Sequence, residues 1–337
     1  MKLSQAKAIA KAAITIETDT LSCVPYLVSG AGIGKTSVVH EIANELGIDC
    51  QILSLAQYDA GELAGWVLPN ADGETMDRRC PDWMPRHGKG ILFLDELPQA
   101  PVSNQNIAAQ LVNERRIGKH HLPEGWHIIA AGNRMSDRAG TNNMPSHLKD
   151  RLMFLEIEAD LEDTIGHYYS KRIDERIAAF LRFRPEWLHK FNRDENACPS
   201  PRSWERVATI LKWKLDPVNQ VEAIAGQVGR AATAEFNGFL KVYDVVPDID
   251  KLIASPASAD IPDAPDVQYA VCAALSSKMT GKNAKNIVTY LKRLPQQEFA
   301  AFVIKDAMNR TEELKRDLKA DASIREWIMS VGKNLIL

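Results

Sequence analysis

The sequence lacks the features that would place it in a membrane, outside the cell or on a polyanion by charge alone. Its 337 residues carry a formal net charge of -3, with a pI of about 6.3, so no global positive field is present. The longest apolar stretches fall far short of the roughly 20 residues that span a bilayer. Residues 1–13 lack the continuous apolar core of a secretory signal. We therefore expect a cytoplasmic protein.

Paired cysteines, linkers and repeats are missing as well. None of the five cysteines forms a CxxC pair, which favours reduced structural thiols over disulfides or zinc ligands. No glycine-, serine- or proline-rich linker separates the halves, and no repeat at a fixed period is visible. Because single cores usually stop growing near ~250 to 300 residues, we expect about two closely packed domains.

The first half alternates short apolar runs with helical patterns. Strands are expected at residues 26–28, 51–55, 91–94 and 128–131, and helices at 36–46 and 104–114. This order predicts an α/β fold with a mainly parallel sheet flanked by helices. Two stretches, 61–85 and 116–126, interrupt the alternation and predict hairpins or loops that project from the sheet.

The second half contains only helical patterns after about residue 160. Apolar residues recur at three- and four-residue spacing, which indicates one buried face for each helix. The expected helices are 174–183, 201–215, 218–228, 231–243, 267–279, 283–294, 296–309 and 324–337. A segment rich in proline and aspartate, residues 255–266, is the best candidate for a boundary within this half.

A phosphate-binding loop is predicted between residues 29 and 36. The segment follows an apolar run and opens a helical pattern, and its glycines let backbone N–H groups turn toward phosphates. Lys35 would reach the β- and γ-phosphates, and the Thr36 hydroxyl would ligate Mg²⁺. Ser29 occupies a position where the strict pattern has glycine, but serine is also small. The expected nucleotide contacts are Ser29, Gly30, Ala31, Gly32, Ile33, Gly34, Lys35, Thr36 and Ser37. The alternative is a glycine turn that binds nothing.

Polar side chains follow two further expected strands. Asp95 and Glu96 come directly after the apolar run 91–94, where Asp95 would hold Mg²⁺ through water and Glu96 would deprotonate the attacking water. Asn133 follows the run 128–131, where its amide could hydrogen-bond the γ-phosphate and the water. Each signal alone also fits an ordinary turn. Because they occur in the same chain as a predicted phosphate-binding loop, nucleotide hydrolysis is favoured over ordinary turns.

The segments SGAGIGKTS, ILFLDE, IIAAGN, GTNNMPSHLKDRLM and SPRSWERV, in this order, resemble the MoxR-like AAA+ ATPases. The resemblance covers roughly residues 20 to 215 and leaves the last third of the chain uncovered. It implies Walker A and Walker B elements, sensor 1 at Asn133 and projecting hairpins. Together with the helical patterns of the second half, we expect a nucleotide-binding α/β domain at 1–158, a helical lid at 159–255 and a C-terminal helical region at 256–337.

Two arginines gain expected roles from this resemblance. Arg151 matches the arginine finger, which is donated to the nucleotide of a neighbouring subunit, and a guanidinium suits the charge of a transferring phosphoryl group. A surface salt bridge to Asp150 or Glu156 is the alternative. Arg202 matches sensor 2, through which the lid responds to the γ-phosphate. A positive charge at a helix start is unfavourable to the helix dipole, which favours a functional reason for Arg202.

A finger in one subunit and a loop in another require a ring, which the resemblance implies is a homo-hexamer. The resemblance also implies a remodelling chaperone that hydrolyses ATP with Mg²⁺. Its partner would carry a von Willebrand A domain, and its client would be a protein. We expect ATP as the nucleotide. The choice between ATP and GTP stays open at this point, because no adenine-specific contact is visible in the sequence.

Two other functions remain open from the residues. A nucleic-acid motor or loader is suggested by basic residues near the second interruption and in the predicted lid, although the net negative charge weakens this hypothesis. These residues are Arg115, Arg116, Lys119, His120, His121, Arg182, Arg184, Lys190 and Arg193. A scaffold that binds ATP only to assemble is the third hypothesis. Glu96 argues against it, because a scaffold has no need of a catalytic base.

Overall fold

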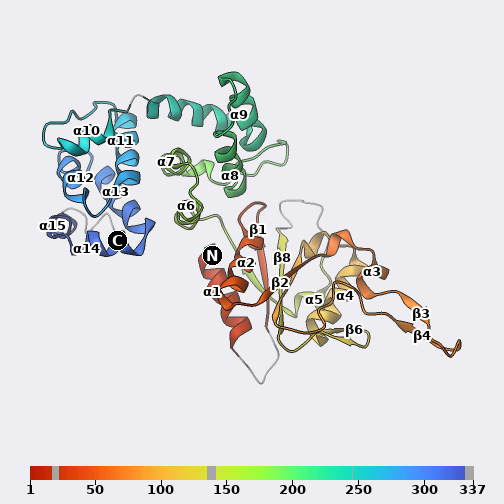
Figure 1. Ribbon diagram of the computed structural model, residues 1–337. Coiled ribbons are helices and arrows are strands. Elements are labelled where there is room, and N and C mark those ends of the chain that lie inside the picture. Colours follow the sequence, from red (N-terminus) through yellow and green to blue (C-terminus); the bar gives the residue numbers. More distant parts are fainter. Residues whose placement is uncertain (17–22, 135–141, 245, 331–337) are drawn as a thin grey trace. The chain divides into compact units, whose positions relative to one another are not determined.

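The computed structural model describes residues 1–16, 23–134, 142–244 and 246–330 (Figure 1). The chain divides into two compact units. The first contains residues 1–160 together with two short later segments, 191–194 and 200–202. The second contains the other described residues from Leu161 onward.

The first unit is built on a five-stranded parallel sheet. Its strand order is β2-β5-β8-β1-β9, with every neighbouring pair parallel. The strands are β2 (Asp49–Ser54), β5 (Gly90–Asp95), β8 (Trp126–Asn133), β1 (Val24–Ser29) and β9 (Leu152–Glu156). The four apolar residues of β5, 91–94, are fully buried, as expected for a strand covered on both faces. The predicted fold class is confirmed.

Helices cover both faces of this sheet. On one face, Leu27, Phe93 and Ile129 belong to the same buried cluster as α1 (Leu3–Thr15) and α2 (Lys35–Leu46). On the other face, residues such as Leu92 and Ile128 pack with three further helices. These are α3 (Ala60–Ala64), α4 (Val102–Glu114) and α5 (Ser146–Lys149). The period-2 alternation of each strand therefore divides its apolar residues between two cores.

The strand register brings the carboxyl ends of the inner strands to one edge. Ser29 of β1 pairs with Asn133 of β8, and Ser54 of β2 pairs with Asp95 of β5. Parallel strands that end in register place the residues after them side by side, which is where open α/β sheets bind ligands. The polar motifs separated by about a hundred residues in sequence therefore meet at this edge.

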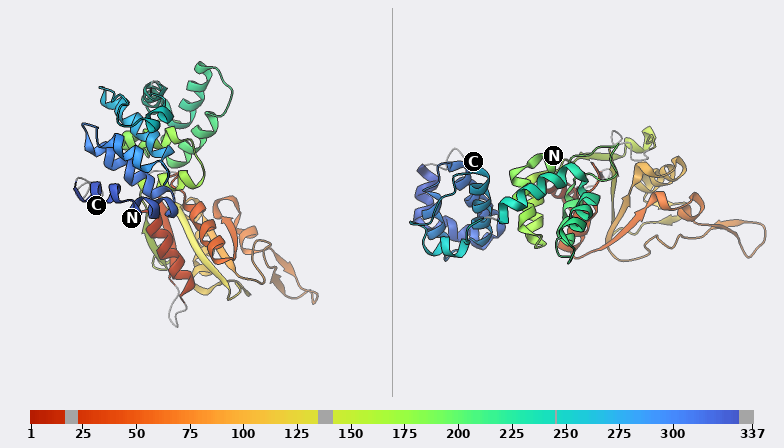
Figure 2. Two further views of the ribbon diagram at one scale, coloured as in Figure 1. Left: turned by 60° about the vertical axis from the view of Figure 1, so that its left-hand side comes forward. Right: turned by 90° about the horizontal axis from the view of Figure 1, so that it is seen from above.

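Both predicted interruptions are hairpins. The first is β3 (Val67–Pro69) with β4 (Met76–Arg78), and it extends away from the sheet in all views (Figures 1 and 2). The second is β6 (Arg116–Ile117) with β7 (His120–His121). Lys119 forms an ion pair with Asp77, and His120 Nε2 lies 2.8 Å from the Arg78 carbonyl oxygen. The two hairpins are thus joined to each other by side chains.

The sequence analysis missed four elements of the first unit. In α1 the buried residues are Ala6, Ala10 and Ile14, whose four-residue spacing is correct for a helix but whose alanines give a weak apolar signal. β9 is an edge strand in which Phe154 is 44% exposed, so it lacks the continuous burial of β5. The helices α3 and α5 have only five and four residues, and α3 lies at the start of the first predicted interruption. Short length and small or half-exposed apolar faces explain these omissions.

The second unit is helical, as predicted. Its helices are α6 (Leu161–Ser170), α7 (Glu175–Phe183), α8 (Pro201–Ile210), α9 (Pro217–Asp244), α10 (Ile249–Ala254), α11 (Pro265–Lys278), α12 (Ala284–Leu291), α13 (Gln297–Arg310), α14 (Glu312–Ala320) and α15 (Ala322–Ser330). Short 3₁₀ turns in the described residues are η1 (Leu55–Gln57) and η2 (Leu97–Gln99) in the first unit and η4 (Pro185–Trp187) in the second. In the part of the chain that the structure describes, no helix is both long and apolar enough to cross a bilayer.

Two details of the second unit refine the sequence analysis. Helix α9 is broken at Gly229, whose φ of 80° and ψ of 160° are not helical, between the predicted helices 218–228 and 231–243. The helices α6, α10 and α14 were not predicted. Residues 331–337, the end of the predicted last helix, lie outside the described residues.

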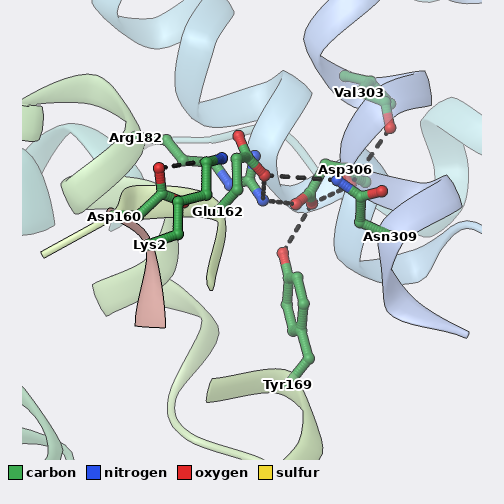
Figure 3. A network of polar contacts seen from close by, with 9 residues as sticks. Lys2, Asp160, Glu162, Tyr169, Arg182, Val303, Asp306 and Asn309 are labelled. Atoms are coloured by element: carbon green, nitrogen blue, oxygen red, sulfur yellow. Dashed lines mark hydrogen bonds and ion pairs between the residues drawn. The ribbon is translucent and has the colours of Figure 1, made fainter. Parts of the chain in front are cut away.

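A buried polar network joins helices of the second unit (Figure 3). The side chains of Arg182 and Asp306 are 6% and 3% exposed and form an ion pair. Asp306 also accepts hydrogen bonds from the Tyr169 hydroxyl, at 2.7 Å, and from the Ser276 hydroxyl, while Glu162 lies 3.4 Å from Arg182. Helices α6 and α7 are thereby tied to α11 and α13. The predicted division of this half near residue 255 stays a prediction.

The network predicts an unequal response to two alanine substitutions. Arg182→Ala leaves the Asp306 carboxylate buried without its cation, so we expect a loss of about 3 to 5 kcal/mol in unfolding free energy. The matched control is Arg230→Ala, since Arg230 is 81% exposed in its pair with Glu222 and should change stability by less than ~1 kcal/mol. Urea denaturation of both variants measures the difference. Equal losses would contradict the assigned role of the network.

Candidate nucleotide-binding site

The loop between β1 and α2 has the backbone shape of a phosphate cradle. Gly32 and Gly34 adopt φ angles of 78° and 104°, which side chains with a Cβ rarely allow. A Cβ on Gly32 would lie 2.6 Å from the Ser200 hydroxyl, so this position also lacks space. Gly34 precedes α2, and no side chain caps the helix start. An uncapped helix N-terminus leaves backbone N–H groups and a positive dipole end for an anion.

A cavity lies at this loop and collects most of the predicted site. Among the described residues its lining consists of Ala31, Gly32, Ile33, Gly34, Lys35, Thr36, Asp95, Glu96, Gln99, Gly132, Asn133 and Arg202. The structure therefore brings the loop, the acidic pair, the amide and the predicted sensor arginine to one place within the first unit. Ser29, Gly30, Ser37 and Arg151 are not part of this lining.

Lys35 connects the loop to the neighbouring strand end. Its ammonium donates to the Ser29 hydroxyl at 2.8 Å, to the Gly30 carbonyl at 3.3 Å and to Asn133 Oδ1 at 3.0 Å. Three acceptors surround a group that has three N–H donors. Its positive charge is thus held at the cavity, between β1 and β8.

The oxygen atoms expected to hold a cation lie together. The Thr36 hydroxyl donates to Asp95 Oδ2 at 3.3 Å, and both residues line the cavity. Burial raises the pKa of the Asp95 carboxyl, and the neighbouring Glu96 charge adds to this, whereas Lys35 and Thr36 oppose it. A bound cation would favour the ionised carboxylate.

Thr36 and Asp95 fit a Mg²⁺ ion that is bound together with other ligands. They do not form a metal site in which every ligand comes from the protein. Mg²⁺ usually takes one or two protein oxygens and completes its shell with water and phosphate. In the described ranges, no group of three or more His, Cys, Asp or Glu side chains could hold a metal ion. Thr36 and Asp95 would therefore hold Mg²⁺ only together with a nucleotide.

Glu96 has a strained backbone and an unexpected partner. Its φ of 56° and ψ of 33° fall in the left-handed region, which is rare for a residue with a side chain and often marks a functional site. Its carboxylate accepts a hydrogen bond from the Ser54 hydroxyl at 3.2 Å. The sequence analysis missed Ser54. Its place at the polar end of an expected strand is visible in the sequence, but its register with Asp95 is visible only in the structure.

Gln99 is a second residue that the sequence analysis missed. It ends the turn η2 after the acidic pair and lines the cavity. Its Oε1 is buried and has no hydrogen-bond partner in the described part of the chain. In the sequence, Gln99 is marked only by its position three residues after Glu96.

The two predicted arginines are placed differently. Arg202 lines the cavity, and its backbone N–H donates to the Gly32 carbonyl at 3.1 Å, so it is attached to the loop directly. Arg151 follows α5 and donates to the His147 carbonyl. No ion pair of Arg151 with Asp150 or Glu156 is present in the described residues, which removes support from the salt-bridge alternative. Residues 140 and 141, which begin its sequence motif, lie outside the described ranges.

Comparison with solved structures finds only matches of low identity and low TM-score. The RuvB Holliday junction branch migration motor of Thermotoga maritima is 16% identical over 86% of each chain, with a TM-score of 0.41. NtrX of Brucella abortus is 14% identical over 97% of this chain and 71% of its own, with a TM-score of 0.39. A putative ATPase of Cytophaga hutchinsonii is 14% identical over 98% and 88%, with a TM-score of 0.36. Likeness at this level supports no statement about function.

Sequence comparison with protein families is more informative. No curated protein is detectably similar to the chain. Residues 25–154 match the family described as "ATPase family associated with various cellular activities (AAA)". The match includes the phosphate-binding loop, the acidic strand end and Asn133, and the parallel sheet has the matching architecture. Residues 25–154 of this chain are therefore similar to an ATPase domain of the AAA family.

Proposed function

We propose that this chain is an ATP-hydrolysing subunit of a MoxR-like ring that remodels a protein client. The observation that carries the proposal is the convergence of Lys35, Asp95, Glu96 and Asn133 at one cavity. A module that only binds nucleotide would not need a carboxylate there to act as base. ATP is the nucleotide proposed, and the adenine contacts are left to experiment.

The residues of the cavity divide the work of hydrolysis. The loop and the start of α2 bind the triphosphate, and Lys35 neutralises its β- and γ-phosphates. Mg²⁺, held by Thr36 and Asp95 with the nucleotide, would supply charge neutralisation of the phosphate oxygens. Glu96 removes the proton from the attacking water, and the Asn133 amide orients that water. The Ser54 hydroxyl competes with the attacking water for the Glu96 carboxylate and can hold that carboxylate away from the water.

Arg151 supports an assembly in which subunits complete one another's sites. It does not line its own cavity, although its sequence motif matches the arginine finger of MoxR-like proteins. A finger supplied from outside the subunit requires a head-to-tail contact, which closes into a ring when the rotation allows. A homo-hexamer is the assembly that the resemblance favours.

Protein remodelling is supported by the hairpin β3–β4. Trp66, Val67, Leu68 and Met76 are between 44% and 66% exposed on or beside it. Exposed apolar side chains gathered on one projecting element are typical of a surface that contacts protein. A partner with a von Willebrand A domain follows from the resemblance to MoxR-like proteins alone.

The alternative of a nucleic-acid motor loses support from the same side chains that suggested it. Near the second hairpin, Arg116 pairs with Glu114 at 2.7 Å and Lys119 pairs with Asp77. Arg182 is buried beside Asp306 in the second unit. Arg184 and Arg193 also lie near carboxylates, Glu235 and Asp194, at 3.7 Å. Five of the nine basic residues that suggested this alternative therefore lie near carboxylates of the same chain, which reduces the positive charge they offer to nucleic-acid phosphates.

Substitution of Glu96 should abolish ATP hydrolysis while leaving ATP binding intact. Glu96→Gln removes the base but keeps the shape of the side chain, so we expect ATP affinity near that of the parent and turnover reduced at least ~100-fold. Lys35→Ala should instead lose ATP affinity. Calorimetry and phosphate release measure the two effects, with Glu186→Gln at an exposed site as the control. Hydrolysis by Glu96→Gln at the parent rate would refute the assigned base.

The proposed finger predicts complementation between two inactive chains. Arg151→Ala should bind ATP normally and hydrolyse it ~10³-fold more slowly, because the charge donor is lost. Mixing it with Lys35→Ala should restore part of the activity, since each chain supplies what the other lacks. Arg230→Ala, at an exposed arginine, should keep parent activity. Absence of rescue at every mixing ratio would argue against a finger acting between subunits.

The stalled Glu96→Gln protein should also reveal what the ring acts on. With ATP present, it should assemble and retain a protein client or a partner with a von Willebrand A domain, identified by mass spectrometry after affinity capture. Glu96→Gln combined with Lys35→Ala is the control that cannot bind ATP. Salt-sensitive stimulation of the parent ATPase by DNA, without a retained protein, would favour the nucleic-acid motor instead.

A further inference from the structure

The hydroxyl of Ser29 has no contact with the cavity, although its position belongs to the phosphate-binding loop motif. Ser29 is the last residue of β1, and its relative exposure is 0%. It is not among the described residues that line the cavity. A role for this hydroxyl in nucleotide binding must therefore act through another residue.

The hydrogen bonds of Ser29 identify that residue as Lys35. The Ser29 hydroxyl donates its only proton to the Gly30 carbonyl at 2.8 Å. Its oxygen lone pairs then face the Lys35 ammonium, also at 2.8 Å. Toward Lys35, the Ser29 hydroxyl can therefore act only as a hydrogen-bond acceptor. An acceptor oxygen stabilises the positive charge of the ammonium. A glycine at this position would offer no such acceptor.

The acceptors of Lys35 differ in their access to a ligand. Asn133 lines the cavity, so an entering phosphate can replace its Oδ1 at the ammonium. Ser29 is buried at the end of a central strand and paired in register with Asn133, so a phosphate cannot reach it. The Ser29 contact can persist when the nucleotide binds. It holds a flexible four-carbon side chain whose ordering otherwise costs conformational entropy on binding.

We propose that Ser29 is a positioning residue, whose hydroxyl holds the Lys35 ammonium toward the cavity and thereby raises the affinity for nucleotides with β- and γ-phosphates. The inference rests on the proposed nucleotide-binding function and deepens it. It assigns to serine a role that the glycine of the strict loop pattern cannot fill.

The affinity test uses the Glu96→Gln background, in which hydrolysis does not interfere. Adding Ser29→Ala should weaken ATP binding about tenfold by calorimetry, because one hydrogen bond to a charged group is lost. Ser29→Cys, which keeps the volume but is a weak acceptor, should behave like Ser29→Ala. Affinities of both variants within twofold of the Glu96→Gln parent would overturn the inference.

A second measurement separates positioning from a purely structural role. In the nucleotide-free protein, Ser29→Ala should lower the thermal midpoint when Lys35 is present and lower it less in a Lys35→Met background. Equal shifts in both backgrounds would show that Ser29 acts independently of Lys35 and would overturn the inference. Failure of the Glu96→Gln parent to bind ATP at all would overturn the proposed function, and this inference with it.

Discussion

The binding edge of the first unit depends on one ammonium group held between two strand ends. Lys35 begins α2, yet its Nζ reaches Ser29 at the end of β1 and Asn133 at the end of β8. These strands are hydrogen-bonded neighbours, and the last residues of both are in register. A shift of either strand by one residue would move its side chains to the opposite face of the sheet and break this connection. The binding edge is therefore fixed by strand register as much as by the loop sequence.

Carboxylates and their polar partners lie close together at the same edge. Burial raises the pKa of Asp95, and Glu96 adds a second carboxylate in a left-handed backbone conformation. Lys35 and the hydroxyls of Thr36 and Ser54 lie against this negative charge. An arrangement of this kind gains most from a ligand that brings both phosphate and a cation, because each then finds its opposite charge.

Much of the fold and the loop could be predicted because strong local patterns encode them. The continuous burial of 91–94 and the glycines before Lys35 leave few alternative structures. The contacts of Ser54 and Gln99 could not be predicted, because they depend on which strand lies beside which. Helix α1 escaped prediction because its buried face is mostly alanine. The tertiary fold determines which side chains lie at the cavity edge. Local sequence patterns, which cover only one helix or strand at a time, do not determine it.

The ion pair between Lys119 and Asp77 makes the two hairpins a linked pair. It joins segments that belong to separate connections of the sheet, one before β5 and one after α4. His120 reinforces the attachment through the Arg78 carbonyl. Lengthening one hairpin alone would displace these groups from each other. A hairpin grafted from another protein would therefore keep this attachment only if its neighbour were transferred with it.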